Sequence, residues 1–426
     1  MNNKLIDASA DTIYLCMYRI ATLVFSVDDK KIVMNGTNVL SVEKLDNFDF
    51  NLRSIIKLRL NVDLRQKIWI INNKTKVKCK FELDKFGMDN EVEGDNVGDQ
   101  NVWNTEFSVF LNDDDASIDT ESLEGVLDNN EGEFKMNDIE NRNYFTDQQV
   151  FEVYLYNTAL LNASRKAVNK IYTSATMAKA AGHILTISGH KNVLMSPMEN
   201  GSAYSELLIP NLPAYKALAY LDQYYGFYKR GASIYYDVDA LYIINPNGKA
   251  TAVKKNEWPE VNFIVTQQVN SMPGNGMIRK EKQKCFYINV PEENVSAQRP
   301  TDTKKLQFGE NIKLVTTNDI AVSNSGKGGN AYQAYQRSDD NKFASSIIQA
   351  RMFENDSIIY IAGDSLDMNA FTINKTYHLT FEDSNKQKKY GKFNYRIAYA
   401  HHYLSMESHN YLKSSHQIVL KKCSEN

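Results

Sequence analysis

Cysteine, proline and glycine are scarce in this sequence, and their scarcity excludes several classes of protein. The 426 residues include four cysteines (Cys16, Cys79, Cys285 and Cys423) that lie far apart, without a Cys-x-x-Cys pair. That spacing argues against a zinc site or a disulfide framework and favours a reducing compartment or plain buried thiols. With 8 prolines and 20 glycines, the chain is neither collagenous nor dominated by linkers.

Long apolar runs and a strong excess of one charge are also missing. The longest apolar run, IYLCMYRIATLVF, contains Arg19 and is too short to span a bilayer, so we expect no membrane insertion. The N-terminal residues lack a basic-then-apolar layout, so we expect no secretory signal. A net charge of −3 argues against a dedicated nucleic-acid binder.

The sequence does contain β-strand patterns, at both of its ends. In SIIKLRLNVDL, apolar residues at Ile56, Leu58, Leu60, Val62 and Leu64 alternate with polar ones, which predicts a strand with one buried face. KVKCKFEL and residues 150–157 repeat the alternation, and no helical period of similar quality occurs in the first eighty residues. After Trp258, turn-bounded strand patterns predict a sandwich or a barrel: VNFIVTQQV, KCFYINV, NIKLVTT, SIIYIAG, TYHLTFE, KFNYRIAYAHHYL and HQIVLKK. AYQAYQ and FASSIIQARMF could form a helix that covers a barrel edge.

An acidic stretch interrupts the first β-region. Residues 111–140 hold eleven acids and one base, Lys135, so this stretch repels itself and can bury little apolar surface. We expect a flexible insertion over about 83–147, with WNTEFSVFL as a strand of that excursion. Because strand alternation returns at 150–157, the insertion interrupts one domain and does not separate two.

The middle of the chain has mixed character. SATMAKAAG predicts a short helix that ends at Gly182 as a left-handed cap, followed by the extended pieces ILTIS and NVLMSPMENG. IPNLPAYKALAYLDQYYG predicts a helix with Pro213 in its first turn and Gly226 at its end. Its apolar stripe is Tyr215, Leu218, Leu221 and Tyr225. ASIYYDVDALYIINPNG predicts a hairpin that turns at Asp237-Val238-Asp239.

These patterns predict three domains. A β-domain with the acidic insertion covers residues 1–160, a small helix–hairpin module covers 161–255, and a second β-domain covers 256–426.

One tetrapeptide has the composition of a catalytic motif. Gly363-Asp364-Ser365-Leu366 follows the apolar strand SIIYIA and matches the signature of an esterase family whose serine is the nucleophile. That chemistry needs a histidine base oriented by a carboxylate. Ser365 lies late in the chain, no Asp-x-x-His follows it, and the surrounding chain lacks βαβ alternation. A β-turn explains the motif better, and hydrolysis by Ser365 stays an alternative.

Other candidate sites are also explained better by structure than by chemistry. Adjacent His401 and His402 point to opposite faces of a strand, so a metal site with His409 and His416 could use at most one of them. GKGG at 326–329 lacks the spacing of a phosphate loop, the acidic run lacks that of a calcium loop, and Asp237 and Asp239 suit a turn. We therefore predict no catalytic, cofactor-binding or metal-binding residue, no cofactor and no enzymatic activity.

One block resembles a known family. Residues 192–245, NVLMSPMENGSAYSELLIPNLPAYKALAYLDQYYGFYKRGASIYYDVDALYIIN, are similar to the middle segment of phage tail and baseplate hub proteins. There an Ile-Pro entry precedes a Leu-x-x-Leu-Asp-x-x-Tyr-Gly-Phe-Tyr helix and a hairpin rich in aromatics. Here these positions are Ile209, Pro210, Leu218, Leu221, Asp222, Tyr225, Gly226, Phe227, Tyr228, Tyr235, Tyr236, Asp237, Leu241, Tyr242 and Ile243. KYGKFNYRIAYAHHYL and HQIVLKK resemble the closing strands of the hub's second barrel.

The resemblance implies a mainly β fold in which two tail-tube-like barrels flank the helix–hairpin module. It also implies a homotrimer in the virion baseplate, assembled in the host cytoplasm, that joins the six-fold tail tube to the three-fold spike. Its partners would be tail tube, central spike and baseplate wedge proteins, and DNA would pass without specific binding. A peripheral baseplate or receptor-binding protein stays an alternative.

The aromatic hairpin raises a question of its own. Adjacent Tyr235 and Tyr236 must face opposite sides of a strand. We expect one to pack against the helix and the other to be free to meet a neighbouring subunit. Replacing the first with Ala should then mainly lower monomer stability, and replacing the second should mainly weaken assembly.

Overall fold

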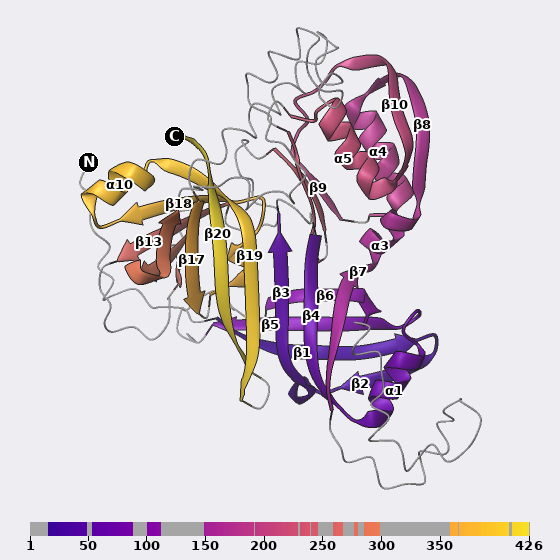
Figure 1. Ribbon diagram of the computed structural model, residues 1–426, viewed down its shortest axis with the longest axis vertical. Coiled ribbons are helices and arrows are strands. Elements are labelled where there is room, and N and C mark those ends of the chain that lie inside the picture. The colour runs from indigo at the N-terminus through magenta and orange to yellow at the C-terminus, as the bar shows by residue number, and fades with distance from the viewer. Residues whose placement is uncertain are drawn as a thin grey trace.

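The computed structural model shows a molecule made mainly of β-strands, with three helices gathered in a module at the upper right (Figure 1). The expectation of a mainly β chain with a small α/β module is confirmed. The structure describes residues 16–48, 53–87, 100–111, 149–190, 192–228, 231–238, 240–245, 259–266, 277–279, 285–298, 358–364, 366–408 and 411–425. The domain boundaries at 160 and 255 stay predictions.

The N-terminal half is built from long strands whose alternation matches the sequence. They are β1 (Cys16–Val27), β2 (Lys30–Met34), β3 (Val39–Asn47), β4 (Arg53–Val62), β5 (Lys78–Gly87), β6 (Gln100–Phe110) and β7 (Gln149–Asn157). In β4, Ile56, Leu58, Leu60 and Val62 are all buried, as the period of two predicts. A short 3-10 turn, η1 (Gly36–Asn38), joins β2 to β3.

The predicted strand does not continue through Leu64. That residue begins helix α1 (Leu64–Asn72), which buries Ile68 and Ile70. Asp63 accepts a hydrogen bond from the Gln66 backbone at 2.8 Å, and the Gln66 side chain accepts one from the Asp63 backbone at 3.3 Å. This reciprocal capping box starts a helix where the apolar alternation alone predicted more strand, because it satisfies two backbone donors of the first turn.

The predicted insertion over about 83–147 begins too early. Leu83 is buried in β5, and β6 pairs with β5 on one side and β7 on the other, so residues 100–110 belong to the main sheet and not to an excursion. Phe107 and Val109 point into the core from β6. Of the acidic stretch 111–140, only Leu111 is among the described residues.

The C-terminal half contains six of the seven predicted strands. NIKLVTT and the predicted helix over AYQAYQ and FASSIIQARMF lie outside the described residues. The strands are β13 (Glu260–Thr266), β14 (Met277–Arg279), β15 (Cys285–Pro291), β16 (Val295–Gln298), β17 (Ile358–Asp364), β18 (Thr376–Phe381), β19 (Phe393–Ser408) and β20 (Tyr411–Glu425). Two 3-10 turns, η4 (Glu292–Asn294) and η5 (Met368–Ala370), and helix α10 (Ser384–Tyr390) connect them.

The long hairpin of β19 and β20 joins the two halves. Tyr399–Ser405 of β19 pair with β3, and Tyr395 of the same strand pairs with β18. The pairings β1–β5–β6–β7–β4–β3–β19–β20–β1 form a closed cycle. One continuous hydrophobic core runs from Phe25 in β1 to Phe263 in β13. The two halves are therefore one packed body.

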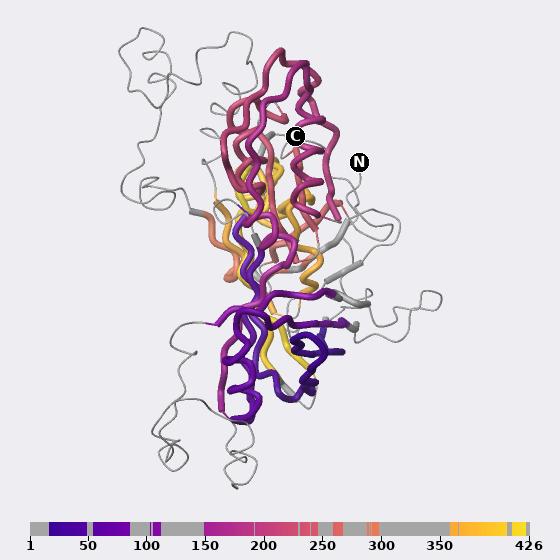
Figure 2. The backbone as a smooth tube through the Cα atoms, turned by 90° about the vertical axis from the view of Figure 1, so that its right-hand side faces the viewer, coloured from indigo at the N-terminus to yellow at the C-terminus, as the bar shows by residue number. Residues whose placement is uncertain are grey.

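The helical module has a core of its own and lies at the top of the view in Figure 2, above the indigo N-terminal strands. It comprises α3 (Thr158–Arg165), β8 (Ala167–Thr176), α4 (Met177–Ser188), β10 (Ala203–Pro213) and α5 (Ala214–Tyr224). The strands β8 and β10 form a separate two-stranded sheet that the sequence did not predict. No helix in the described part of the chain is long and apolar enough to cross a membrane.

Two of the predicted features in this module are wrong. Gly182 lies inside α4 and does not end it, and residues 184–188 of the predicted extended piece are helical. The helix ends at Gly189, whose φ of 75° is the left-handed conformation expected of a C-cap glycine. Met177, Ala180, Ala181 and Ile184 form a buried stripe, so packing of this stripe outweighs the helix-breaking tendency of Gly182. The predicted end of α5 at Gly226, with φ 73°, is confirmed.

Three short strands attach the module to the sheet. They are β9 (Val193–Met195), β11 (Ser233–Tyr236) and β12 (Leu241–Ile244). The predicted hairpin of β11 and β12 is confirmed, with Asp237 donating its backbone N–H to Ala240 at the turn. Tyr236 of β11 pairs with Arg53 of β4, which continues the main sheet into the module.

Candidate functional site

The aromatic hairpin β11–β12 separates two hydrophobic cores. Tyr235, Val238 and Tyr242 belong to the core of the main sheet, whereas Tyr236 and Ile243 belong to the core of the module. Alternating residues of a strand point to opposite faces, so a hairpin between two cores needs apolar residues at every position. This explains the concentration of tyrosines.

The expectation that one of the two tyrosines meets a neighbouring subunit is wrong. Tyr235 is fully buried and Tyr236 is 5% exposed, so both contribute to the fold of the same chain. They do face opposite sides, as predicted. Replacing either with Ala is now expected to lower monomer stability.

A buried polar junction forms where the hairpin meets strand β3. The Tyr235 hydroxyl donates a hydrogen bond to Asp46 Oδ1 at 2.5 Å. Lys44 Nζ donates to Asp46 Oδ2 at 2.7 Å and lies 3.2 Å from Asp237 Oδ1. Asp46 and Tyr235 are fully buried and Lys44 nearly so. Two carboxylates and one ammonium therefore meet inside the protein, a situation that requires close pairing.

The charges of this junction shift its pKa values in directions that favour the observed pairing. Burial alone would lower the pKa of Lys44, but the carboxylates of Asp237 and Asp46 outweigh it and raise that pKa above its usual value. Burial and the same two carboxylates raise the pKa of Tyr235 well above its ordinary range. Lys44 thus stays charged and Tyr235 stays a hydrogen-bond donor.

A pair of histidines lies beside this junction. His402 of β19 and His416 of β20 face each other across the hairpin, with their Nδ1 atoms 2.6 Å apart, and His402 Nε2 lies 3.7 Å from Asp46 Oδ2. Burial, then the nearby His416 and Lys44, lowers the pKa of His402 well below its usual value. Burial lowers the pKa of His416 to about 3. Both imidazoles are therefore neutral at pH 7, and one Nδ1 donates to the other.

The prediction that His401 and His402 point to opposite faces is confirmed. His402 is buried, whereas His401 is half-buried and its Nε2 lies 2.8 Å from Glu43 Oε1. His409 lies outside the described residues. Among the described residues, no group of histidine, cysteine or carboxylate side chains could hold a metal ion.

One contact has the geometry of a catalytic pair. Ser414 Oγ lies 2.9 Å from His416 Nε2, a serine–histidine arrangement that the sequence did not single out. However, Ser414 is fully buried in the core and its histidine is hydrogen-bonded to a second histidine instead of a carboxylate. A substrate carbonyl cannot reach this hydroxyl without opening the core, so the contact serves to satisfy buried polar atoms.

The described residues around the Gly-Asp-Ser-Leu motif serve as an anchor. Ser365 itself lies outside the described residues, and so do Asp239 and GKGG at 326–329. Leu366 is buried, and its carbonyl accepts a hydrogen bond from the Tyr18 hydroxyl at 2.9 Å. Asp367 is buried and pairs with Lys85 Nζ at 2.5 Å. Burial alone would raise the pKa of Asp367. Lys85, with the Asn369 backbone and Lys375, lowers that pKa by more than burial raises it, so the net shift is downward and the ion pair persists at neutral pH.

The Leu-Asp-x-x-Tyr-Gly-Phe-Tyr motif has a structural explanation. Asp222, buried on α5, accepts hydrogen bonds from the backbone N–H groups of Phe227 and Ala232 at 3.2 and 3.0 Å. Asn200 donates its side-chain N–H to the carbonyls of Tyr225 and Gly226. These bonds satisfy the backbone that leaves the helix, and they direct it into β11.

The two tyrosines of β11 allow a test of the junction by matched substitutions. Tyr235→Phe removes a hydrogen bond to a buried carboxylate and is expected to lower the free energy of unfolding by about 1.5–3 kcal/mol. Tyr236→Phe is expected to leave it unchanged or to raise it, because the buried Tyr236 hydroxyl has no hydrogen-bond partner among the described residues. Urea unfolding of the two variants measures the difference. Equal losses would contradict the assigned role of Asp46.

Comparison with known proteins gives one family and several similar structures. A family model for the bacteriophage PBS1 gene 109 protein matches residues 17–423. A search of curated proteins gives no match. The tail protein from Neisseria meningitidis MC58 is a similar solved structure, with 10% sequence identity and a TM-score of 0.48 over 96% of this chain and 97% of that chain.

Two further solved structures are similar. The 43 kDa tail protein of prophage MuSo2 from Shewanella oneidensis shares 9% identity, with a TM-score of 0.43 over 93% of this chain and 96% of that chain. An E. coli component of the type VI secretion system shares 7% identity, with a TM-score of 0.42 over 94% and 76%. The family match spans far more than residues 192–245, from which the resemblance to phage proteins was drawn, and it confirms that resemblance at the level of the family.

Proposed function

The chain belongs to the bacteriophage PBS1 gene 109 protein family, and from this premise we propose that it is a structural protein of the phage tail. We propose further that it acts as the central hub of the baseplate. Three copies form a ring that joins the six-fold tail tube to the three-fold spike and lets DNA pass without specific binding. Its partners are then the tail tube, central spike and baseplate wedge proteins, and it is assembled in the host cytoplasm into the virion.

The observation that carries this proposal is the continuity between the two β-halves. The hairpin β19–β20 pairs with β3 and β1 of the N-terminal half and with β17 and β18 of the C-terminal half. Because the same core fills both halves, one cannot rotate relative to the other without breaking strand pairs and apolar contacts. Such a rigid body suits an adaptor that must transmit force between tube and spike.

The proposed role needs no catalysis. The described serine–histidine contact is sealed in the core, and the polar junction ties together elements of the fold. This is the arrangement expected of a protein whose task is to hold its shape.

The proposal predicts a homotrimer on the tail axis. Sedimentation equilibrium of the purified chain is expected to give three times the monomer mass, and negative-stain electron microscopy is expected to show a three-fold ring. In virions, a labelled chain should lie on the axis between tube and spike. A strictly monomeric protein at high concentration would contradict the ring, and a label away from the axis would favour the peripheral baseplate alternative.

A further inference from the structure

Charge is unevenly distributed along this chain despite its small net charge of −3. Residues 111–140 hold eleven acids and one base. Residues 384–423, which cover α10, β19 and most of β20, hold eight bases and one acid, Glu407. Two segments of opposite charge in one sequence are candidates for binding each other.

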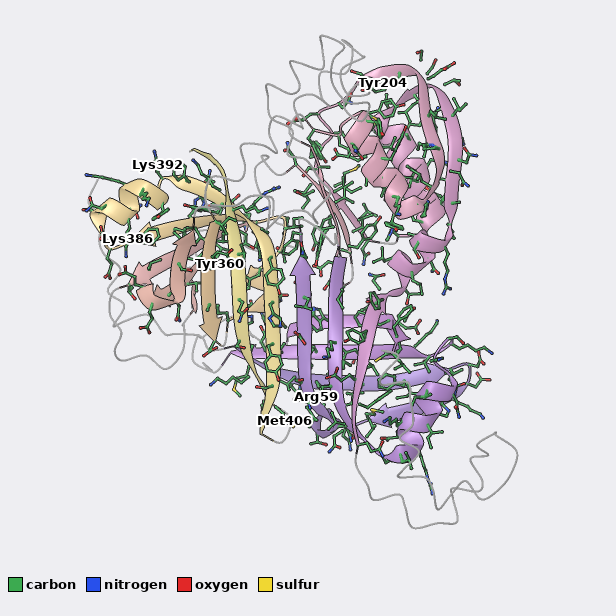
Figure 3. The ribbon with its side chains drawn as sticks, viewed as in Figure 1. Arg59, Tyr204, Tyr360, Lys386, Lys392 and Met406 are labelled. Atoms are coloured by element: carbon green, nitrogen blue, oxygen red, sulfur yellow. The ribbon has the colours of Figure 1, made fainter. Side chains whose placement is uncertain are left out.

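The basic segment forms a compact surface in the structure. We use the term basic surface for Lys388, Lys389, Lys392 and Lys422. The first three are exposed and Lys422 is half-buried, at the end of α10 and the adjoining parts of β19 and β20. Lys386, next to them, pairs with Glu292. Figure 3 shows Lys386 and Lys392 at the same outer corner of the molecule.

Aromatic rings contact three of these four ammonium groups, those of Lys389, Lys392 and Lys422. Lys392 and Lys422 both lie over the ring of Phe393, with their Nζ atoms 4.8 and 3.6 Å from its centroid. Lys389 Nζ lies 4.8 Å from the centroid of Tyr390, whose carbonyl accepts a hydrogen bond from Tyr395. Such contacts restrict the lysine side chains, which reduces the entropy that an incoming acidic partner would have to overcome.

We propose that the basic surface binds residues 111–140 of a second copy of this chain. The acidic segment carries a charge opposite to that of the basic surface, and its single base, Lys135, adds little repulsion to the attraction. The chain as a whole is not basic, which argues against a nucleic-acid backbone as the main partner.

The proposed ring places a second copy beside each chain, and the anchoring of the two segments suits a contact between neighbouring copies. Residues 111–140 follow β6 and precede β7, and β7 lies on the opposite side of the molecule from α10 (Figure 1). A contact between opposite sides of identical chains is head-to-tail, and such contacts close into rings when the rotation between subunits permits. The inference thus rests on the proposed ring for its second copy and names the electrostatic contact between neighbours.

Binding to the acidic segment can be tested with a peptide in excess over the chain, so that it competes with the same segment of a neighbouring copy. A synthetic peptide of residues 111–140 is titrated into the full chain at low salt by fluorescence anisotropy. The triple variant Lys388→Gln, Lys389→Gln, Lys392→Gln is expected to bind it about tenfold more weakly, and 1 M NaCl is expected to abolish binding. The matched control Lys170→Gln, Lys179→Gln, Lys216→Gln removes the same charge from exposed lysines of the module and should bind like wild type. Equal binding by the two variants would overturn the proposal.

Assembly of the full chain provides the second test. The triple variant Lys388→Glu, Lys389→Glu, Lys392→Glu should raise the concentration needed for self-association at least tenfold, and adding Asp113→Lys, Asp114→Lys, Asp115→Lys to it should restore association. Circular dichroism confirms folding of each variant.

A wild-type trimer that the triple Lys→Glu variant does not weaken would overturn the contact and leave the hub proposal intact. A monomeric wild type that binds the peptide would contradict the hub and keep the contact. Loss of duplex DNA binding without any loss of peptide binding would assign the surface to nucleic acid instead.

Discussion

Lys44→Met is expected to lower the free energy of unfolding by about 3–5 kcal/mol, because it leaves two carboxylates inside the protein without their cation. Asp46 is fully buried, and the side chain of Asp237 is 13% exposed, so water cannot fully replace the ammonium. Tyr235 also donates a hydrogen bond to Asp46, but a neutral hydroxyl does not replace the charge of the ammonium. Urea unfolding at pH 7.5 measures the loss.

A surface ion pair provides the matched control for this experiment. Lys57 pairs with Glu152 at 2.7 Å, but both side chains are more than a quarter exposed. Lys57→Met is therefore expected to cost less than about 1 kcal/mol. The combined variant Lys44→Met, Asp46→Leu, Tyr235→Phe removes the ammonium together with the fully buried carboxylate and leaves only the partly exposed Asp237, so it should recover part of the loss. If Lys44→Met costs no more than Lys57→Met, the junction does not stabilise the fold.

Local sequence patterns predicted the strands and the hairpin well because packing follows them directly. The alternation in β4 matches its buried face, and the turn before Leu241 joins the two strands that the sequence indicated. Gly226 ends α5 in a left-handed conformation, as its position after the apolar stripe predicted. In each case, the residues that determine the structure lie close together in the sequence.

The errors arose where local signals compete. At Asp63, a capping box starts a helix inside what reads as one continuous apolar alternation. At Gly182, the packing of a buried alanine-rich stripe carries the helix past a residue of low helix propensity. One of Tyr235 and Tyr236 was expected to be exposed for a neighbouring subunit, but Tyr236 is buried in a second core that forms only when β8, β10 and the helices assemble. Tertiary packing decides the second and third cases, whereas local capping decides the first.

The polar junction could not be predicted from the sequence. Tyr235 and Asp46 are 189 residues apart, and Tyr18 contacts Leu366 across 348 residues. No spacing rule connects such residues, and Lys44 and Asp46 have the sequence character of ordinary surface charges. The histidine pair was closer to detection, because His402 and His416 lie 14 residues apart on neighbouring strands, but their register was not determined by composition.

Acid is expected to destabilise the protein through the same two histidines. The folded pKa of His416 is about 3, whereas an unfolded histidine titrates near 6.5, so below about pH 6.5 the unfolded chain binds a proton that the folded chain excludes. Stability is therefore fully present above pH 6.5 and is lost as the pH falls toward 3. At pH 4.5, which lies about two pH units below the pKa of an unfolded histidine, the proton excluded by His416 costs about 2–3 kcal/mol of stability. His402 adds to this loss.

A double variant separates this effect from the titration of carboxylates. His402→Gln, His416→Gln removes both titrating groups, so between pH 7.5 and pH 4.5 its free energy of unfolding should fall by at least about 2–3 kcal/mol less than that of wild type. His401→Gln, on the outer face of the same strand, controls for the effect of placing glutamine in β19. A double variant with the wild-type slope would show that the buried pair does not titrate on unfolding. Because the pair links β19 to β20 beside β3, the acid-driven loss acts on the hairpin that holds the two β-halves together.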